Sequence, residues 1–263
     1  MRYDLPDAIR VDADGPVRLV RLTRPEQLNA VNDDLHLGLT QVFPQLSADP
    51  DARVAVVTGE GRAFSAGGDF DLLDRMAKDR VLRRDVIAEG RELVLNMIRC
   101  RVPVVAAVNG PAVGLGCSVI ALSDVVYMAE SAYLSDPHVT VGLVAADGGP
   151  LSWPLHTSLL LAKEYAFTGE RISAARAAEI GLANHVCKDE EVVPAALAAA
   201  RKIAALPQQA VEATKRVLNL HLERAVLATI DFAMASETES FDTEDLRANI
   251  DRFRQRQPRG DAP

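Results

Sequence analysis

Short apolar runs alternate with amphipathic segments along most of the chain. The runs are rich in valine and alanine, a composition and length typical of buried strands. They occupy residues 17–22, 53–58, 102–108 and 124–129. In the longer segments between them, apolar residues recur at helical spacing, which predicts helices that pack on a sheet. The alternation of strands and helices favours an α/β fold over an all-β one.

Helix signals mark the remaining segments. Asn32 and Asp33 can cap a helix whose apolar face extends to Leu46, and Asp49-Pro50 ends that helix. We expect further helices at 79–99, 117–122, 153–168 and 173–181, followed by alanine-rich helical sequence from Pro194 almost to Pro258. The second half of the chain is therefore predicted to be mainly helical.

The segment 101–124 joins a predicted strand to a predicted helix through a turn that contains Gly110, Gly114 and Gly116. The first N–H groups of such a helix have no intrahelical partner and point, with the positive end of the helix dipole, at whatever lies in front. A second glycine corner, at residues 59–70, follows another predicted strand. Two such corners can supply the backbone donors of an oxyanion hole. The alternative is a tight packing corner without chemistry.

Composition narrows the possible partners. The 263 residues are 48% hydrophobic and 25% charged, which suffices for a large core. The 29 basic and 37 acidic residues give a net charge of −8, which argues against nucleic acid or an anionic membrane as the main partner. The three cysteines include no CxxC pair and indicate neither a disulfide framework nor a zinc site. With no signal or membrane-span pattern, we expect a cytoplasmic protein.

Five motifs stand out from this background. They are Arg24-Pro-Glu-Gln-Leu-Asn-Ala30, Phe64-Ser-Ala-Gly-Gly-Asp69, Asn109-Gly-Pro-Ala-Val-Gly-Leu-Gly116, Thr168-Gly-Glu-Arg-Ile-Ser173 and Ile180-Gly-Leu-Ala-Asn184. Together with a later helix that carries Lys215-Arg216, they resemble the enoyl-CoA hydratase/isomerase family, the crotonase superfamily, in order and spacing. The resemblance covers roughly residues 10–258.

The resemblance implies an α/β fold, a crotonase-like spiral of ββα units over residues 1–194 with a C-terminal helical oligomerisation region over residues 195–263. It also implies an acyl-CoA substrate and assembly into homotrimers or dimers of trimers. No resident cofactor or metal is implied, because CoA is part of the substrate.

The resemblance also assigns site residues. The backbone N–H groups of Gly68 and Leu115 would form the oxyanion hole around a thioester carbonyl. Leu28 and Phe70 are equally compatible with plain core packing. The residues implied to hold CoA are Leu28, Ala30, Ala66, Asp69, Phe70, Gly114 and Phe253.

The acid–base positions depart from the family's hydratases. Two glutamates that act on the water and proton in those enzymes correspond here to Ser118 and His138. A serine is not a base near neutral pH, so Ser118 can orient a water or fill space. An unperturbed imidazole titrates near pH 6.5, where a general base is most useful. Asp147, nine residues after His138, is expected to orient the imidazole. The alternative places His138 in a turn and Asp147 as a loop-end charge.

Three functions are compatible with this pattern. The first is an enzyme that stabilises the enolate of an acyl-CoA thioester, with His138 and Asp147 as an acid–base pair in place of the glutamates. The second is a CoA-independent hydrolase of a cyclic β-diketone, because Pro137-His138 and Ala146-Asp147-Gly148 resemble elements of 6-oxocamphor hydrolase, a member of the superfamily. The third is a catalytically silent binding protein of the same fold, suggested by the loss of both glutamates.

Overall fold

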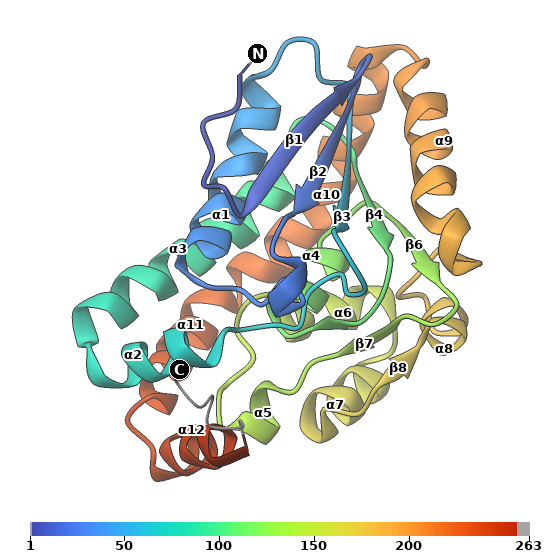
Figure 1. Cartoon of the computed structure of the whole chain (residues 1–263). Helices are drawn as coiled ribbons and strands as arrows, with labels where there is room; N and C mark the ends of the chain where they lie inside the picture. Colours follow the sequence, from blue (N-terminus) through green and yellow to red (C-terminus); the bar gives the residue numbers. More distant parts are fainter. Residues whose placement is uncertain (1, 257–263) are drawn as a thin grey trace, which may run out of the picture.

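A six-stranded sheet forms the centre of the protein (Figure 1). The computed structural model describes residues 2–256. The first two strands pair antiparallel, and every later pairing in this sheet is parallel. In spatial order the strands are β1 (Ile9–Asp14), β2 (Val17–Leu22), β3 (Val54–Gly59), β4 (Val104–Val108), β6 (Val125–Ala129) and β9 (His185–Cys187).

Helices cover both faces of this sheet, which explains the continuous apolar runs of its central strands. All six residues of β3 are buried. One face packs on a large core that includes α1 (Asp33–Ala48) and α3 (Arg80–Arg99). The other face packs on α9 (Val192–Ala204) through Ala196, Ala200 and Ala204. Alanine at these positions lets the helix approach the valines of the sheet closely.

A three-stranded sheet brings the two glycine corners together. It consists of β5 (Ala112–Val113), β7 (Tyr133–Ser135) and β8 (Ile172–Ser173). A parallel bridge pairs Ser65 in the first corner with Ala112 in the second, and another pairs Val31 with Gly68. Helix α4 (Leu115–Ala121) begins directly after β5. The start of α4 and the loop before α2 (Phe70–Lys78) therefore face a common space.

The last two helices of the chain close over this space. A separate apolar cluster joins Leu72 and Met76 of α2 to Phe241, Leu246 and Ile250 near the C-terminus. Lys215 is buried and donates to the Val102 carbonyl at 2.8 Å and to the Asp124 carboxylate at 2.7 Å, which ties α10 to the sheet. The helices after α9 are α10 (Gln208–Leu227), α11 (Ile230–Ser240) and α12 (Glu244–Arg256).

Most expected elements are present, with several differences. β1, α2 and the short strands β5, β7, β8 and β9 were not expected. The helix expected at 153–168 is two helices, because the Ser158 side chain caps a new helix by accepting from the Leu161 N–H. The boundary expected at residue 194 falls inside α9, which packs on the sheet, and residues 257–263 lie outside the described residues. The remaining short helices are η1 (Pro25–Gln27), α5 (His138–Val141), α6 (Gly149–His156), α7 (Leu159–Thr168), α8 (Ala174–Glu179) and η2 (Asp189–Glu191). Within residues 2–256, no helix combines the length and apolarity that a membrane crossing requires.

Candidate active site

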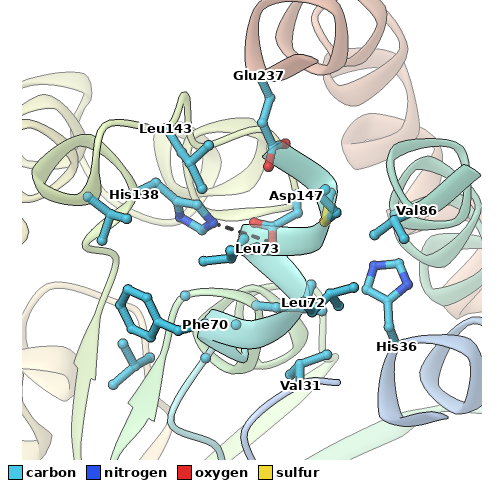
Figure 2. A pocket seen from close by; sticks show the side chains of 18 of the residues that line it. Val31, His36, Phe70, Leu72, Leu73, Val86, His138, Leu143, Asp147 and Glu237 are labelled. Carbon is cyan, nitrogen blue, oxygen red and sulfur yellow. Dashed lines mark ion pairs between the residues drawn. The ribbon is translucent and has the colours of Figure 1, made fainter. Parts of the chain in front are cut away.

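A cavity of about 220 Å³ lies where α2, α3, α5 and α11 meet the two glycine corners (Figure 2). Its walls are mainly apolar, and a few ionisable side chains enter it from four separate parts of the chain. Such a site, apolar with a small number of convergent polar groups, is typical of small-molecule binding. The apolar side chains include Val31, Phe70, Leu72, Leu73, Met76, Val86, Ile87, Val141, Leu143 and Met234.

Two backbone N–H groups at the cavity edge are free to bind a ligand. Gly68 and Leu115 both line the cavity. Leu115 is the first residue of α4 and follows Gly114, whose φ of 52° places the backbone in the left-handed region. Neither N–H has a hydrogen-bond acceptor among residues 2–256. Two donors of this kind at one cavity could hold a developing oxyanion, the role that the family resemblance implies for them.

The imidazole of His138 lies between two carboxylates. Its Nδ1 hydrogen bonds to Asp136, and its Nε2 lies 3.7 Å from Oδ2 of Asp147. Burial alone would lower the pKa of His138, but the negative charges of Asp136 and Asp147 outweigh it and raise this pKa to about 10. His138 is therefore an imidazolium at neutral pH. It carries a proton to donate, which differs from the neutral base expected from the sequence.

Asp136 takes the orienting role expected of Asp147. Its side chain is 1% exposed, and burial opposes its ionisation, yet the adjacent His138 cation lowers its pKa. Its second oxygen, Oδ2, finds no hydrogen-bond partner in the described part of the chain. The charge of this buried carboxylate is therefore balanced chiefly by His138.

Ser118 positions Asp147. Its hydroxyl donates to Oδ1 of Asp147 at 2.8 Å, from a fully buried place in α4. Gly148, with a φ of 158°, lies directly against Ser118, and a Cβ there would fall 2.5 Å from the serine Cβ. Only glycine lets the Asp147 loop approach α4 this closely. Ser118 does not line the cavity itself.

Glu237 of α11 extends into the cavity toward Asp147 and His138 (Figure 2). It is 9% exposed, and its carboxyl group makes no hydrogen bond or ion pair with the described residues. Burial, together with the negative charge of Asp147, raises the pKa of Glu237 to about 8. At neutral pH the cavity therefore holds the protonated carboxylic acid of Glu237 and the imidazolium of His138.

Most of the chain matches a known family. The family model described as enoyl-CoA hydratase/isomerase matches residues 12–259. The chain belongs to this family.

Individual proteins similar to this chain carry names of the same family. The human mitochondrial Delta(3,5)-Delta(2,4)-dienoyl-CoA isomerase is 32% identical over 93% of this chain and 78% of its own length. A probable mitochondrial enoyl-CoA hydratase of Dictyostelium discoideum is 29% identical over 91% of this chain and 85% of its own. Among solved structures, an enoyl-CoA hydratase/isomerase from Mycobacterium paratuberculosis is 65% identical, with a TM-score of 0.93 and coverage of 95% of this chain and 100% of that one.

The residues that the family resemblance assigns to CoA divide into two groups. Ala66, Phe70 and Gly114 line the cavity, whereas Leu28, Ala30, Asp69 and Phe253 do not. Asp69 caps α2 by accepting from the Asp71 N–H at 2.9 Å, and Leu28 accepts from Ala66 N–H at 2.9 Å. Phe253 stacks on Phe70 with ring centroids 3.5 Å apart, within the same chain. The second group lies outside the lining of this cavity, and its contact with CoA stays a prediction.

Three ionisable residues of the site were not predicted. Asp136 was visible in Asp136-Pro-His138, but the orienting carboxylate was sought at Asp147. Glu237 lies in a helical region with many charged residues, and nothing in the neighbouring sequence distinguishes it from the charged residues that face solvent. His36 lies in a predicted amphipathic helix, where a histidine is more often a packing or surface residue, and it lines the cavity.

Proposed function

We propose that the protein catalyses proton transfer on an acyl-CoA thioester, with the enolate oxygen held by the N–H groups of Gly68 and Leu115. The observation that carries this proposal is that these two unpartnered donors and the cluster of His138, Asp147 and Glu237 open onto one cavity. Oriented donors at a developing oxyanion are among the strongest contributions to catalysis, each worth about 3 kcal/mol.

The protonation states of His138 and Glu237, together with the position of Asp147, indicate which group accepts a proton and which donates one. Asp147 is the base: it takes a proton from the carbon next to the thioester, and the electron pair of that C–H bond moves onto the carbonyl oxygen. Its geometry suits this role, because Ser118 fixes Oδ1 and Oδ2 lies toward the cavity near His138. The imidazolium of His138 stabilises the anion and can supply a proton at another carbon. Return of the proton at a different carbon moves a double bond, so the cluster favours isomerisation over hydration.

Exchange of the α-protons in D2O tests enolate formation without knowledge of the natural acyl group. We expect butyryl-CoA and 3-hexenoyl-CoA to incorporate deuterium, as measured by mass spectrometry. Asp147→Asn should slow exchange by about 10²-fold or more. Asp51→Asn, at an exposed aspartate after α1, is the matched control and should exchange like the unmodified protein. Binding of both thioesters without exchange would refute the proposal and favour a silent binding protein.

A second function, hydrolytic C–C cleavage of a cyclic β-diketone without CoA, is favoured by one observation. The row of Asp136, His138 and Asp147 side chains resembles the carboxylate–histidine arrangement of hydrolases more than a pair of hydratase glutamates. This enzyme would convert a free cyclic β-diketone to a keto acid, adding water across the broken C–C bond, and would have no affinity for CoA. Calorimetric titration with CoA, beside turnover of 1,3-cyclohexanedione derivatives, separates the two functions.

We also propose that the protein assembles into trimers, as the family resemblance implies. Four large apolar side chains on α6 and α7 are exposed, at fractions of 51–80%. An exposed apolar group of this size is typical of a protein–protein interface. The residues are Leu155, Leu159, Leu160 and Phe167. Sedimentation equilibrium measures the assembly directly.

A further inference from the structure

His36 lies on the cavity wall away from His138 (Figure 2). It comes from α1, is 7% exposed, and its Nδ1 lies 3.0 Å from Oε2 of Glu89 in α3. The hydroxyl of Thr40 donates both to the His36 carbonyl, at 3.0 Å, and to the Glu89 carbonyl, at 3.3 Å. The two helices therefore hold the imidazole in a fixed orientation.

The free nitrogen of this imidazole faces the cavity. A carboxylate only accepts hydrogen bonds, so Nδ1 carries a proton and Nε2 is left for another partner. None of the residues 2–256 hydrogen bonds to Nε2. Gly90, which also lines the cavity, is a neighbour of this nitrogen: a Cβ at residue 90 would lie 3.8 Å from it, in ordinary van der Waals contact.

The cavity wall next to Nε2 of His36 is apolar. Leu72, Met76, Val86 and Ile87 line the cavity with apolar groups only. A hydrocarbon chain that filled this space would remove water from Nε2 and give it no partner, which is unfavourable for a buried polar atom. A ligand with an oxygen at this point would satisfy it.

We propose that His36, oriented by Glu89, binds a hydroxyl or keto oxygen on the acyl part of the substrate. The enzyme then prefers an oxygenated acyl group to a plain hydrocarbon chain. A neutral imidazole accepts from a hydroxyl group, and a protonated one donates to a keto group. The inference rests on the proposed function, because the thioester at Gly68 and Leu115 fixes how the acyl chain enters.

Equilibrium binding of matched thioesters tests this preference. The probes are octanoyl-CoA and octanoyl-CoA derivatives with a hydroxyl or keto group at one of carbons 4 to 7, measured by calorimetry. We expect at least one oxygenated probe to bind about tenfold or more tightly than octanoyl-CoA, which corresponds to about 1.4 kcal/mol. His36→Leu should bring that ratio close to one without weakening octanoyl-CoA.

Two further variants distinguish recognition of the substrate oxygen by His36 from a general effect on the packing of the cavity wall. Glu89→Gln keeps the size of the side chain at a partly exposed position, so it should fold normally and reduce the ratio in part. Val86→Ala alters the same wall without a polar atom and should change the affinity of both classes of probe alike. Circular dichroism checks the fold of each variant.

The outcomes distinguish this inference from the proposed function. A ratio near one for every oxygenated probe in the unmodified protein, or a high ratio that survives His36→Leu, overturns the role of His36 even though CoA thioesters bind. Failure of octanoyl-CoA and all its derivatives to bind refutes the proposed function, and the inference falls with it.

Discussion

Removal of the Asp136 charge should convert His138 from a permanent cation into a group that titrates near neutral pH. The pKa of His138 is about 10, against an ordinary 6.5. At 1.36 kcal/mol per unit, the surroundings therefore favour the imidazolium by about 5 kcal/mol after burial has been overcome. Asp136 is the larger of the two carboxylate contributions, and it also accepts the hydrogen bond from Nδ1. In Asp136→Asn we expect the pKa of His138 to fall by about 1–3 units.

Nuclear magnetic resonance measures this shift directly. The Cε1 signal of ¹³C-labelled histidine is followed from pH 5 to 11, and His138→Gln identifies which signal belongs to His138. Circular dichroism at each pH confirms that the chain remains folded. Asp147→Asn serves as the comparison, and it should lower the pKa of His138 by less than Asp136→Asn does.

Stability gives an independent measure of the same shift. Because the folded pKa of His138 is raised, its stabilising contribution is complete below about pH 6.5 and is lost as the pH rises toward about 10. This loss should be smaller in Asp136→Asn. The reasoning is refuted if His138 titrates near pH 6.5 in the unmodified protein, or if Asp136→Asn leaves its titration unchanged.

Three further predictions concern Glu237, Asp49 and Leu160. The pKa of Glu237 is raised to about 8, so the folded protein keeps a proton that the unfolded chain releases, and stability falls as the pH rises from about 5 to 8. Glu237→Gln should remove this part of the fall in urea denaturation and leave the part above about pH 6.5 that comes from His138. An equal fall in both proteins would contradict the prediction. The carboxylate of Asp49 lies 2.7 Å from the buried guanidinium of Arg18. Asp49→Ala removes this counter-charge and should lower the free energy of unfolding, measured in urea, by about 3–5 kcal/mol. A decrease below about 1 kcal/mol would argue against the pair. Leu160 is 80% exposed on α7, so Leu160→Asp should leave the monomer folded but prevent trimer formation, as measured by sedimentation equilibrium. Intact trimers of this variant would exclude α7 from the interface.

The fold was predictable wherever short segments carry their own signals. The inner strands β2, β3 and β4 are buried on both faces, and Asn32 and Ser173 cap their helices as expected. β1 is an edge strand in which apolar and charged residues alternate strictly, a pattern that indicates a strand with one solvated face, so β1 was predictable as well. The break at Ser158 was missed because both flanking segments are apolar, so the serine that starts α7 does not interrupt the pattern.

The site was predictable in its backbone and only partly in its charges. Gly68, Leu115, His138 and Asp147 meet at one cavity, as their motifs implied. Which carboxylate hydrogen bonds to Nδ1 of His138 depends on side-chain directions that a sequence does not contain. Glu237 arrives from a helix almost a hundred residues after His138, and only tertiary packing gives it a place.

Charge balance explains how this cavity can act without the two glutamates. At neutral pH, Asp136 is negative, His138 is positive and Glu237 is neutral, so these three groups carry no net charge, and the charge that the proposed reaction moves is that of the Asp147 base. When Asp147 takes a proton from the substrate in the proposed reaction, that charge moves to the oxygen held by Gly68 and Leu115. The net charge inside the apolar walls is the same before and after the step. Because burial penalises net charge most strongly, a transfer that only relocates the charge beside a fixed imidazolium avoids a large desolvation cost.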